Sequence, residues 1–380
     1  MRLSADLAEA LGRCTGVVAD SHTLPAACYV DPEVADLEAE TVFRQGWVGI
    51  GRGDRWTASG DYVAMDLGGV PVVVVRDEEG VLRAYANTCR HRSAQVMEGE
   101  GHCTRMRCPF HFWTYGLDGR LLGAPSMQDT NDFERADHGL SEFAIAERHG
   151  FAFVSLEGSP PPIDDWLGDF ADLHARWDLG SMVTTRRREF TVACNWKAFA
   201  EVFNEYYHLP YVHPGSIDDT YDDPDDPEVV VGAWATHAGT TQGTGGLLET
   251  DQAKALPVIG TLNEREARGV RYSWLYPTLV IATGAEGMWM YEVYPDGPDR
   301  CRCAQVVCFP PETAALDGFA EVAEAYYERF DVAIAEDIPM LEQQHRGMRS
   351  PFARQGRFSH LEPNVARFAG WYAERLLSVG

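Results

Sequence analysis

The stretches Cys89-Arg90-His91 and Cys108-Pro109-Phe110-His111, separated by sixteen residues, decide the fold of the first part of the chain. Each stretch pairs one cysteine with one histidine, and both residue types are common metal ligands. Few structural needs place these ligand types together on two short loops. Two thiolates and two imidazoles form the ligand set of a [2Fe-2S] centre in which the cysteines hold one iron and the histidines hold the other. Such a centre moves single electrons.

Two other interpretations use the same four side chains. Zinc binds two cysteines and two histidines, but zinc fingers usually pair Cys with Cys and His with His, whereas each pair here is mixed. In the third interpretation the residues only pack a core. The flanking sequence favours the iron–sulfur centre, of the Rieske type: Pro109 restricts the second loop, and Trp113 and Tyr115 before Asp118-Gly119 predict an aromatic strand and a turn.

Length and composition indicate an intracellular globular protein. With 380 residues the chain can form two domains with separate cores. The longest aliphatic run, Val70 to Val75, is too short to cross a bilayer, and the first twelve residues lack the apolar core of a signal peptide. Nine cysteines, an odd number scattered along the chain, do not form a disulfide framework. We therefore expect a cytoplasmic protein with no membrane partner.

The charge balance argues against nucleic acid as a partner. The formal net charge is -26, and only Lys197 and Lys254 among the 32 basic residues are lysines. Binding to phosphates needs a basic surface, which this composition does not provide. The acidic excess fits a partner with a positive docking patch, or simple solubility, and we slightly prefer the second explanation.

The residues before position 159 predict a small antiparallel β-domain. The segments Asp61 to Met65, Val70 to Arg76 and Leu82 to Tyr85 are short and apolar, and glycine-containing turn signals separate them. The run Ser159-Pro160-Pro161-Pro162 then predicts a boundary. We expect an N-terminal helical segment at 1–40, a cluster-binding β-domain at 41–158 and a second domain at 159–380.

The second domain is predicted to mix helices and strands, which makes the fold class α+β. Helical patterns cover Asn195 to His208 and Glu312 to Gln344, and two aromatic-rich strands are expected between Tyr272 and Tyr294. Glu205 and His208 share a face of the first helix, and His213 follows five residues later. A bend at Pro210 would turn both imidazoles toward one point, as a site of two histidines and one carboxylate requires.

Together, the two metal motifs resemble those of the oxygenase (α) subunits of Rieske non-haem iron oxygenases, the family of ring-hydroxylating dioxygenases and of choline and carnitine monooxygenases. The resemblance extends over nearly the whole chain. It is carried by Leu24-Pro25, Tyr29, Trp47, Gly60-Asp61-Tyr62, Arg76, Asn87, the two Cys/His loops, Asn195-Trp196-Lys197, Glu205, His208 and His213. The resemblance implies a Rieske domain, a catalytic domain with a curved antiparallel sheet around a long helix (helix-grip, START-like), and a homotrimer.

The resemblance also implies the site residues. Cys89, His91, Cys108 and His111 would bind the [2Fe-2S] cluster. A mononuclear Fe(II) would be held by His208, His213 and an acidic residue on a late helix, which we take as Asp337 with Glu336 as the alternative. Glu205 would link a cluster histidine of one subunit to an iron histidine of the next and relay electrons and protons. The family usually has small residues where Ser93 and Phe112 stand.

The implied activity is hydroxylation of a small organic substrate with O2. The glycines from Gly49 to Gly53 lack the context of a nucleotide-binding turn, so NAD(P)H and flavin would act through a separate reductase. Glu205 stands where many members have Asp, and this resembles the branch that oxidises quaternary amines. We therefore expect a monooxygenase that demethylates or cleaves an N-methyl or quaternary amine. An aromatic ring-hydroxylating dioxygenase or monooxygenase and a non-catalytic electron carrier are the alternatives.

Aromatic residues are frequent in the second domain and set the expectation for its substrate site. Their rings could surround a quaternary ammonium, stack on an aromatic substrate, or pack the core, which is the default for most of them. The residues are Phe199, Phe203, Tyr206, Trp234, Trp274, Tyr276, Trp289, Tyr291 and Tyr294.

Overall fold

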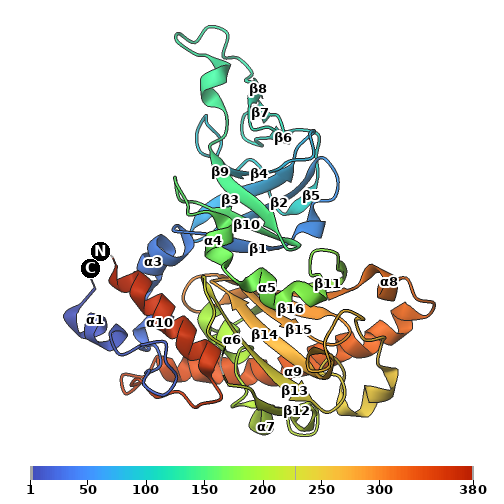
Figure 1. Cartoon of the computed structure of the whole chain (residues 1–380). Coiled ribbons are helices and arrows are strands. Elements are labelled where there is room, and N and C mark those ends of the chain that lie inside the picture. The colour runs from blue at the N-terminus through green and yellow to red at the C-terminus, as the bar shows by residue number, and fades with distance from the viewer. Residues whose placement is uncertain (1–2, 227, 379–380) are drawn as a thin grey trace. The chain divides into compact units, whose positions relative to one another are not determined.

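The computed structural model describes residues 3–226 and 228–378, and its contacts divide them into two compact units. The smaller unit runs from Phe43 to Ile163. The larger unit combines the residues up to Val42 with those from Asp164 onward, so the darkest blue and the red parts of the chain in Figure 1 belong to the same unit. None of the described helices has the length and apolarity needed to cross a membrane.

The smaller unit is an antiparallel β-domain. Its main sheet has the strand order β1-β10-β9-β4-β3-β2-β5, and a small second sheet has the order β6-β7-β8. The strands are β1 Val48–Arg52, β2 Asp61–Leu67, β3 Val70–Arg76, β4 Leu82–Ala86, β5 Glu100–His102, β6 Met106–Arg107, β7 Thr114–Tyr115, β8 Leu121–Gly123, β9 Glu142–Arg148 and β10 Phe151–Ser155. The three strands expected from the sequence are present as β2, β3 and β4. Gly68 and Gly69 form the β2–β3 turn with positive φ angles of 58° and 78°, which glycine adopts at little cost.

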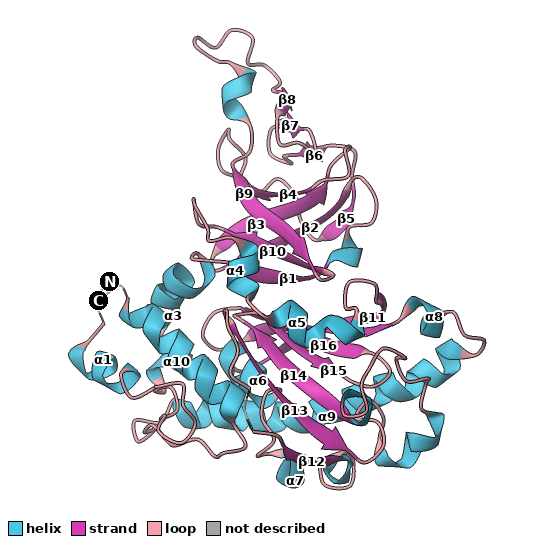
Figure 2. Cartoon of the chain, viewed as in Figure 1, coloured by secondary structure: helices cyan, strands magenta, loops and turns pink. Residues whose placement is uncertain are grey.

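The larger unit is built on a second antiparallel sheet with the order β11-β17-β16-β15-β14-β13-β12. Figure 2 shows β13 to β16 side by side. The strands are β11 Val183–Val192, β12 Tyr221–Pro224, β13 Trp234–Thr241, β14 Gly269–Leu275, β15 Leu279–Thr283, β16 Met288–Pro295 and β17 Cys301–Phe309. The sequence predicted two strands between Tyr272 and Tyr294, but three strands cross this segment. The difference arises because Pro277 lies in a tight turn within a run that is apolar throughout.

The helices belong almost entirely to the larger unit. They are α1 Ala5–Leu11, α2 Ala27–Val30, α3 Pro32–Glu38, α4 Ile163–Leu167, α5 Phe170–His174, α6 Trp196–Val202, α7 Leu209–Val212, α8 Pro311–Ala314, α9 Phe319–Met348 and α10 Pro363–Leu377. Within this unit α10 packs on β13, and α6 contacts both β16 and α9. An antiparallel sheet with one helix of 30 residues confirms the predicted α+β class and its long late helix.

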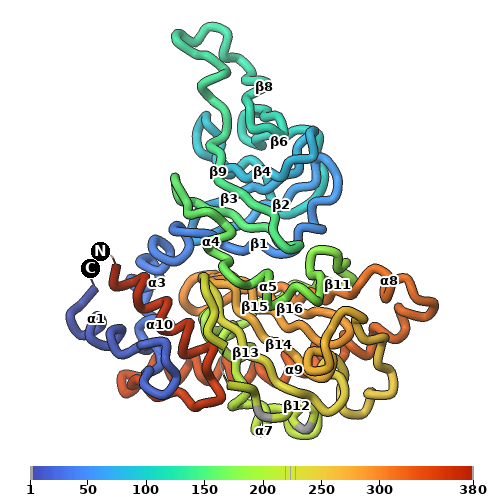
Figure 3. Tube along the Cα trace, in the orientation of Figure 1, coloured from blue at the N-terminus to red at the C-terminus, as the bar shows by residue number. Residues whose placement is uncertain are grey.

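The predicted helix from Asn195 to His208 is wrong at its C-terminal half. Asn195 caps the helix as expected, accepting a hydrogen bond from the backbone N–H of Lys197 at 3.1 Å, but α6 ends at Val202. The side-chain amide of Asn204 then donates to the carbonyl of Ala200 at 2.8 Å. A side chain that binds the backbone in this way competes with continued helix, and the next residues form turns. Figure 3 follows the chain onward through α7 and β12 to β13.

A buried polar cluster fixes α6 against the N-terminal and C-terminal helices of the same unit. The carboxylate of Glu38 accepts hydrogen bonds from the indole N–H of Trp196 at 2.6 Å and from the hydroxyl of Tyr372 at 2.7 Å. Glu38 also forms an ion pair with the ammonium of Lys197, and both side chains are almost inaccessible to solvent. Because a buried charge pair is stable only when its remaining hydrogen bonds are satisfied, this cluster holds α3, α6 and α10 in one arrangement.

Candidate metal centres

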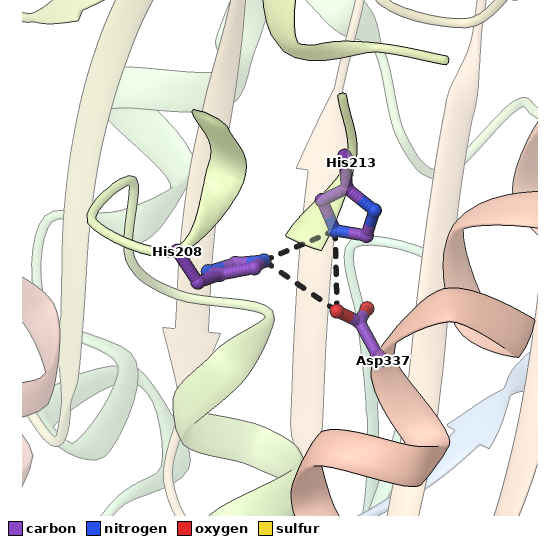
Figure 4. A group of neighbouring side chains, drawn as sticks. All are labelled: His208, His213 and Asp337. Carbon is purple, nitrogen blue, oxygen red and sulfur yellow. Dashed lines mark hydrogen bonds and ion pairs between the residues drawn. The ribbon is translucent and has the colours of Figure 1, made fainter. Parts of the chain in front are cut away.

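Three side chains of the larger unit converge on one point (Figure 4). The Nε2 atoms of His208 and His213 are 3.2 Å apart, and the Oδ1 atom of Asp337 lies 3.6 Å from the first and 3.1 Å from the second. Together these residues offer three ligand atoms within 4.8 Å of one another. Two imidazoles and one carboxylate are the facial ligand set of non-haem Fe(II) oxygenases.

The local backbone explains how residues five apart reach the same point. On one straight helix, His208 and His213 would differ in direction by about 140°. Instead His208 immediately precedes the single turn of α7 and His213 immediately follows it. Pro210 occupies the first turn of α7, where its missing N–H costs nothing. The predicted break at Pro210 is therefore present, although it takes the form of a short separate helix.

The protons of the two imidazoles are directed away from the converging atoms. Nδ1 of His208 lies 2.5 Å from Glu205, and Nδ1 of His213 lies 2.8 Å from Glu336. A carboxylate only accepts, so each Nδ1 carries the proton and each Nε2 presents a lone pair. Oδ1 of Asp337 is buried and accepts no hydrogen bond from the described residues. Three acceptor atoms facing one another without a proton between them fit a bound cation.

Electrostatics around His208 agree with this fit. Burial acts to lower the pKa of His208, but the carboxylates of Glu205, Asp337 and Glu362 together outweigh it, and the pKa is raised. The site thus favours positive charge at this imidazole. A metal ion at Nε2 supplies that charge, and Glu205 behind Nδ1 orients the ring and increases its basicity as a ligand.

The structure separates the two acidic residues that the sequence left as alternatives for the third ligand. Asp337 points between the two Nε2 atoms, whereas Oε2 of Glu336 lies behind His213 and accepts a hydrogen bond from the hydroxyl of Ser216 at 2.9 Å. The geometry therefore favours Asp337 as the ligand and gives Glu336 a supporting position. The sequence did not indicate the supporting position of Glu336 behind His213. Glu336 and Asp337 are adjacent acidic residues on α9, and only the directions of their side chains distinguish their roles.

The smaller unit brings the two Cys/His loops together. Cys89 and Cys108 are buried, at 2% and 1% exposure, whereas His91 is exposed and His111 is half-buried. The rings of the two histidines lie 4.6 Å apart. Burial raises the pKa of the Cys108 thiol, while the backbone amides of Phe110 and His111 act to lower it. The two thiols are therefore buried, the two imidazoles are more accessible, and backbone amides are directed at a sulfur. This arrangement fits a [2Fe-2S] cluster.

The two departures from the family pattern have a backbone explanation. Ser93 and Phe112 have φ angles of 60° and 61°, in the left-handed region that glycine adopts most easily. Each residue closes a tight turn, because its N–H donates to the carbonyl of the cysteine four residues earlier, at 2.9 Å for Ser93 and 3.1 Å for Phe112. Glycine would relieve strain at both positions, and this chain forms the two turns with residues that carry a Cβ atom.

Comparison with known families decides the assignment. The family model described as the ring hydroxylating alpha subunit (catalytic domain) matches residues 174–378. The model of the Rieske [2Fe-2S] domain matches residues 46–134. The chain belongs to this family. It is a Rieske-type non-haem iron oxygenase α subunit, and the predicted family, enzyme class, cluster and mononuclear iron are confirmed. Membership implies a reductase partner.

Two relatives of this oxygenase act on quaternary amines according to their names. It is 28% identical to the glycine betaine monooxygenase oxygenase subunit of Chromohalobacter salexigens, over 94% of this chain and 86% of the relative. It is 29% identical to the chloroplastic choline monooxygenase of Beta vulgaris, over 94% and 78% of the two chains.

The fold is shared with solved structures of both substrate branches. A quaternary ammonium Rieske monooxygenase studied for carnitine oxidation superposes with a TM-score of 0.80, at 22% identity over 99% of each chain. Naphthalene 1,2-dioxygenase from Rhodococcus sp. superposes with a TM-score of 0.78, also at 22% identity over 99% of each chain. These likenesses establish the fold alone.

The oxygenase has a small cavity of about 40 Å³ beside the three converging ligands. Of the aromatic residues considered from the sequence, Phe199, Phe203, Tyr206 and Tyr291 line it. The others, Trp234, Trp274, Tyr276, Trp289 and Tyr294, do not line the cavity. Among the lining residues that sequence reasoning missed are Tyr272 and Arg329, because an isolated tyrosine or arginine carries no spacing signal.

Glu205 and His208 line this cavity and also a wider groove of about 530 Å³ in the larger unit. Tyr29, Glu201 and Glu362 line the groove as well. Glu205 therefore has one side toward the ligand group and another toward an opening of the larger unit.

Proposed function

We propose that this oxygenase hydroxylates a carbon attached to nitrogen in a small N-methyl or quaternary amine. The observation that carries the proposal is the small, ring-lined cavity at the ligand group, where Phe203 and Tyr272 lie edge to face at 5.3 Å and Phe203 and Tyr291 at 5.1 Å. Aromatic faces attract a quaternary ammonium. The names of the glycine betaine and choline monooxygenases support the same substrate class.

The reaction balances with one O2, two electrons and two protons. One oxygen atom enters the C–H bond beside nitrogen and the other leaves as water. A hydroxyl group on that carbon makes the C–N bond unstable, so the product separates into a shorter amine and an aldehyde, which is formaldehyde when a methyl group is attacked. The electrons come from NAD(P)H through a separate flavin or ferredoxin-type reductase.

In this proposal His208, His213 and Asp337 hold the mononuclear iron, and Cys89, His91, Cys108 and His111 hold the cluster. When bound, the iron supplies the activation of O2 and the cluster supplies single electrons. Glu205 and Glu336 keep the Nδ1 protons in place and fix both imidazole rings. The aromatic rings exclude water and hold the substrate against the ligand group.

We further propose that Glu205 accepts a second hydrogen bond from His111 of a neighbouring subunit in a homotrimer. Two facts support this role: Glu205 contacts His208 directly, and it also lines the wide groove of the larger unit. A carboxylate oxygen has two lone pairs, so it can serve two imidazoles at once. In this arrangement, residues 41–158 of one chain serve the catalytic residues within 159–380 of the next.

An aromatic ring hydroxylation is the second candidate. The likeness to naphthalene 1,2-dioxygenase concerns the fold and specifies no substrate for this chain. The non-catalytic carrier is not supported, because a catalytic-domain model covers residues 174–378.

The deciding experiment supplies reductase, NADH and O2 together with a panel of N-methyl amines and monocyclic aromatics. The proposal expects formaldehyde or another aldehyde and a shortened amine, and a ring diol or phenol as the sole product would contradict it. Iron analysis checks the ligands: about three irons per chain are expected for the wild type. Asp337→Ala should retain only the two cluster irons, while Glu336→Ala should still bind the third when iron is in excess.

A further inference from the structure

A buried cation lies in the substrate cavity without a carboxylate partner. Arg329 of α9 is only 4% exposed and lines the same cavity as the ligand group. Its Nη2 donates to the hydroxyl of Tyr221 at 2.8 Å, and its guanidinium faces the rings of Trp289 and Phe330 at 5.4 Å and 5.3 Å. Its Nε has no acceptor among the described residues, and no described carboxylate forms an ion pair with it.

Three other shielded arginines of the larger unit have carboxylate partners, whereas Arg367 donates to the backbone carbonyls of Trp234 and Val230. Arg187 pairs with Glu292 at 2.7 Å, Arg186 pairs with Asp331 at 2.6 Å, and Arg271 pairs with Glu228. A guanidinium stays protonated at any working pH, and burying it without a counter-charge is costly. Aromatic rings offset only part of this cost. Because Arg329 lies in the substrate cavity, its charge there calls for a negative group that the described chain does not supply.

Arg329 is placed to bind one end of a substrate whose other end reaches the metal ligands. Arg329, Ala333 and Asp337 are spaced four residues apart on α9, and all three line the cavity. Eight residues of helix separate the backbones of Arg329 and Asp337 by about 12 Å. An elongated small molecule can therefore contact both ends.

We propose that Arg329 binds a carboxylate of the substrate, at the end opposite the carbon that is oxidised. This inference rests on the proposed function for the nature of the other end: a methylated nitrogen together with a carboxylate makes the substrate a zwitterion rather than a simple cation. A planar guanidinium with an unused N–H suits a carboxylate, which accepts two parallel hydrogen bonds. The hydroxyls of Tyr221 and Tyr272, 2.9 Å apart, add polar contacts at the same end.

The test compares probes that differ only in charge. Anaerobic calorimetry of the holoenzyme would measure binding of gamma-butyrobetaine and of its carboxamide, which has nearly the same size. A second pair, benzoate and benzamide, carries the same difference without an ammonium. The variants are Arg329→Gln, which removes the charge, and Arg329→Lys, which retains it. Cluster absorbance and thermal unfolding check that each variant is folded.

The expected result is that the wild type binds gamma-butyrobetaine roughly 10- to 100-fold more tightly than the carboxamide, the range for hydrogen bonds to charged groups. Arg329→Gln should lose that preference and bind the carboxamide as before, and Arg329→Lys should keep part of it. Equal binding of acid and amide by the wild type, or an unchanged preference in Arg329→Gln, would overturn the inference. If Arg329→Gln does not fold, the test relies on two other results. These are the preference of the wild type for the carboxylate over the carboxamide, and the reduction of that preference in Arg329→Lys.

The two proposals fail separately. If amines are oxidised but carboxylate and carboxamide bind equally, the function stands and the role of Arg329 is wrong. If neither amine probe binds, while benzoate binds more tightly than benzamide and only when Arg329 is present, the carboxylate site stands and the amine function is wrong.

Discussion

Glu205 lies 2.5 Å from Nδ1 of His208, and the same carboxylate accepts a hydrogen bond from the backbone N–H of His208 at 3.1 Å. One side chain thus fixes both the ring and the backbone of a metal ligand. His213 has a corresponding carboxylate in Glu336, at 2.8 Å. Both imidazoles are therefore supported in the same way, although only Glu205 also lines the wide groove.

This difference predicts distinct effects of two matching variants. Glu336→Gln should weaken iron binding by about 10- to 100-fold, the usual effect of losing a hydrogen-bond partner behind a ligand. Glu205→Gln should retain both metals when iron is in excess, yet slow oxidation of the reduced cluster by O2 and substrate. Single-turnover spectroscopy of the cluster measures the rate. If Glu205→Gln, with both metals bound, oxidises its cluster at the wild-type rate, the bridging role of Glu205 is incorrect.

A buried carboxyl that does not line the ligand cavity predicts a pH-dependent stability. Burial raises the pKa of Glu286 from 4.5 to about 7, and the hydroxyl of Thr244, 2.6 Å away, acts in the opposite direction. Because the pKa is raised in the folded state, its stabilising effect is present below pH 4.5 and is lost as the pH rises toward 7. The loss is at most about 3 kcal/mol.

Glu286→Gln removes this ionisation and keeps an oxygen acceptor for Thr244. We expect the variant to be more stable than the wild type at pH values above that range, and the difference to shrink on acidification. Thermal unfolding of the wild type and of Glu286→Gln at a series of pH values measures the difference in their stability. Other titrating groups contribute equally to both proteins, so their contributions cancel in this difference. A difference that stays constant with pH would contradict the raised pKa.

The left-handed turn at Ser93 predicts that glycine stabilises the first cluster loop. Relief of the φ strain should exceed the backbone entropy that glycine loses on folding, for a net gain of about 0.5 to 1 kcal/mol for Ser93→Gly. Denaturant unfolding monitored by cluster absorbance provides the measurement. Ser159→Gly, at an exposed position without a positive φ, is the matched control and should show no gain.

The two lysines of the chain are expected to differ in how strongly their replacement lowers the stability of the fold. Lys197 is fully buried and forms an ion pair with Glu38, so Lys197→Met should leave an uncompensated carboxylate and cost about 3 to 5 kcal/mol. Adding Glu38→Gln should recover part of the loss. Lys254, with a 54% exposed side chain, should tolerate methionine without measurable change. Urea unfolding compares the variants, and equal effects at the two lysines would refute the importance of the buried pair.

The sequence predicts the two metal centres because their residues are close in the chain. The mixed Cys/His loops and the pair His208 and His213 each lie within a short segment, so spacing and residue type carry the signal. The ligand roles stay predictions that the geometry supports. The choice between Asp337 and Glu336 needed the direction of α9, because adjacent residues on a helix point about 100° apart.

Other features depend on contacts between distant segments. The early end of α6 follows from a side-chain hydrogen bond of Asn204, which helix periodicity does not reveal. The strand β15 was hidden because buried neighbours made the whole run apolar. Arg329 gave no signal in the sequence, since its significance is the lack of a carboxylate around it in three dimensions.

The long helix α9 supplies both Asp337 and Arg329, so one rigid element sets the separation between the metal ligands and the charged end of the cavity. The separation between Asp337 and Arg329 therefore does not depend on the conformation of a loop. Exchanging the residues at Arg329 and Ala333 would move the positive charge about 6 Å along the helix, by one helical turn, without touching a metal ligand. If Arg329 binds the substrate as proposed, this exchange should shift the preference toward shorter substrates.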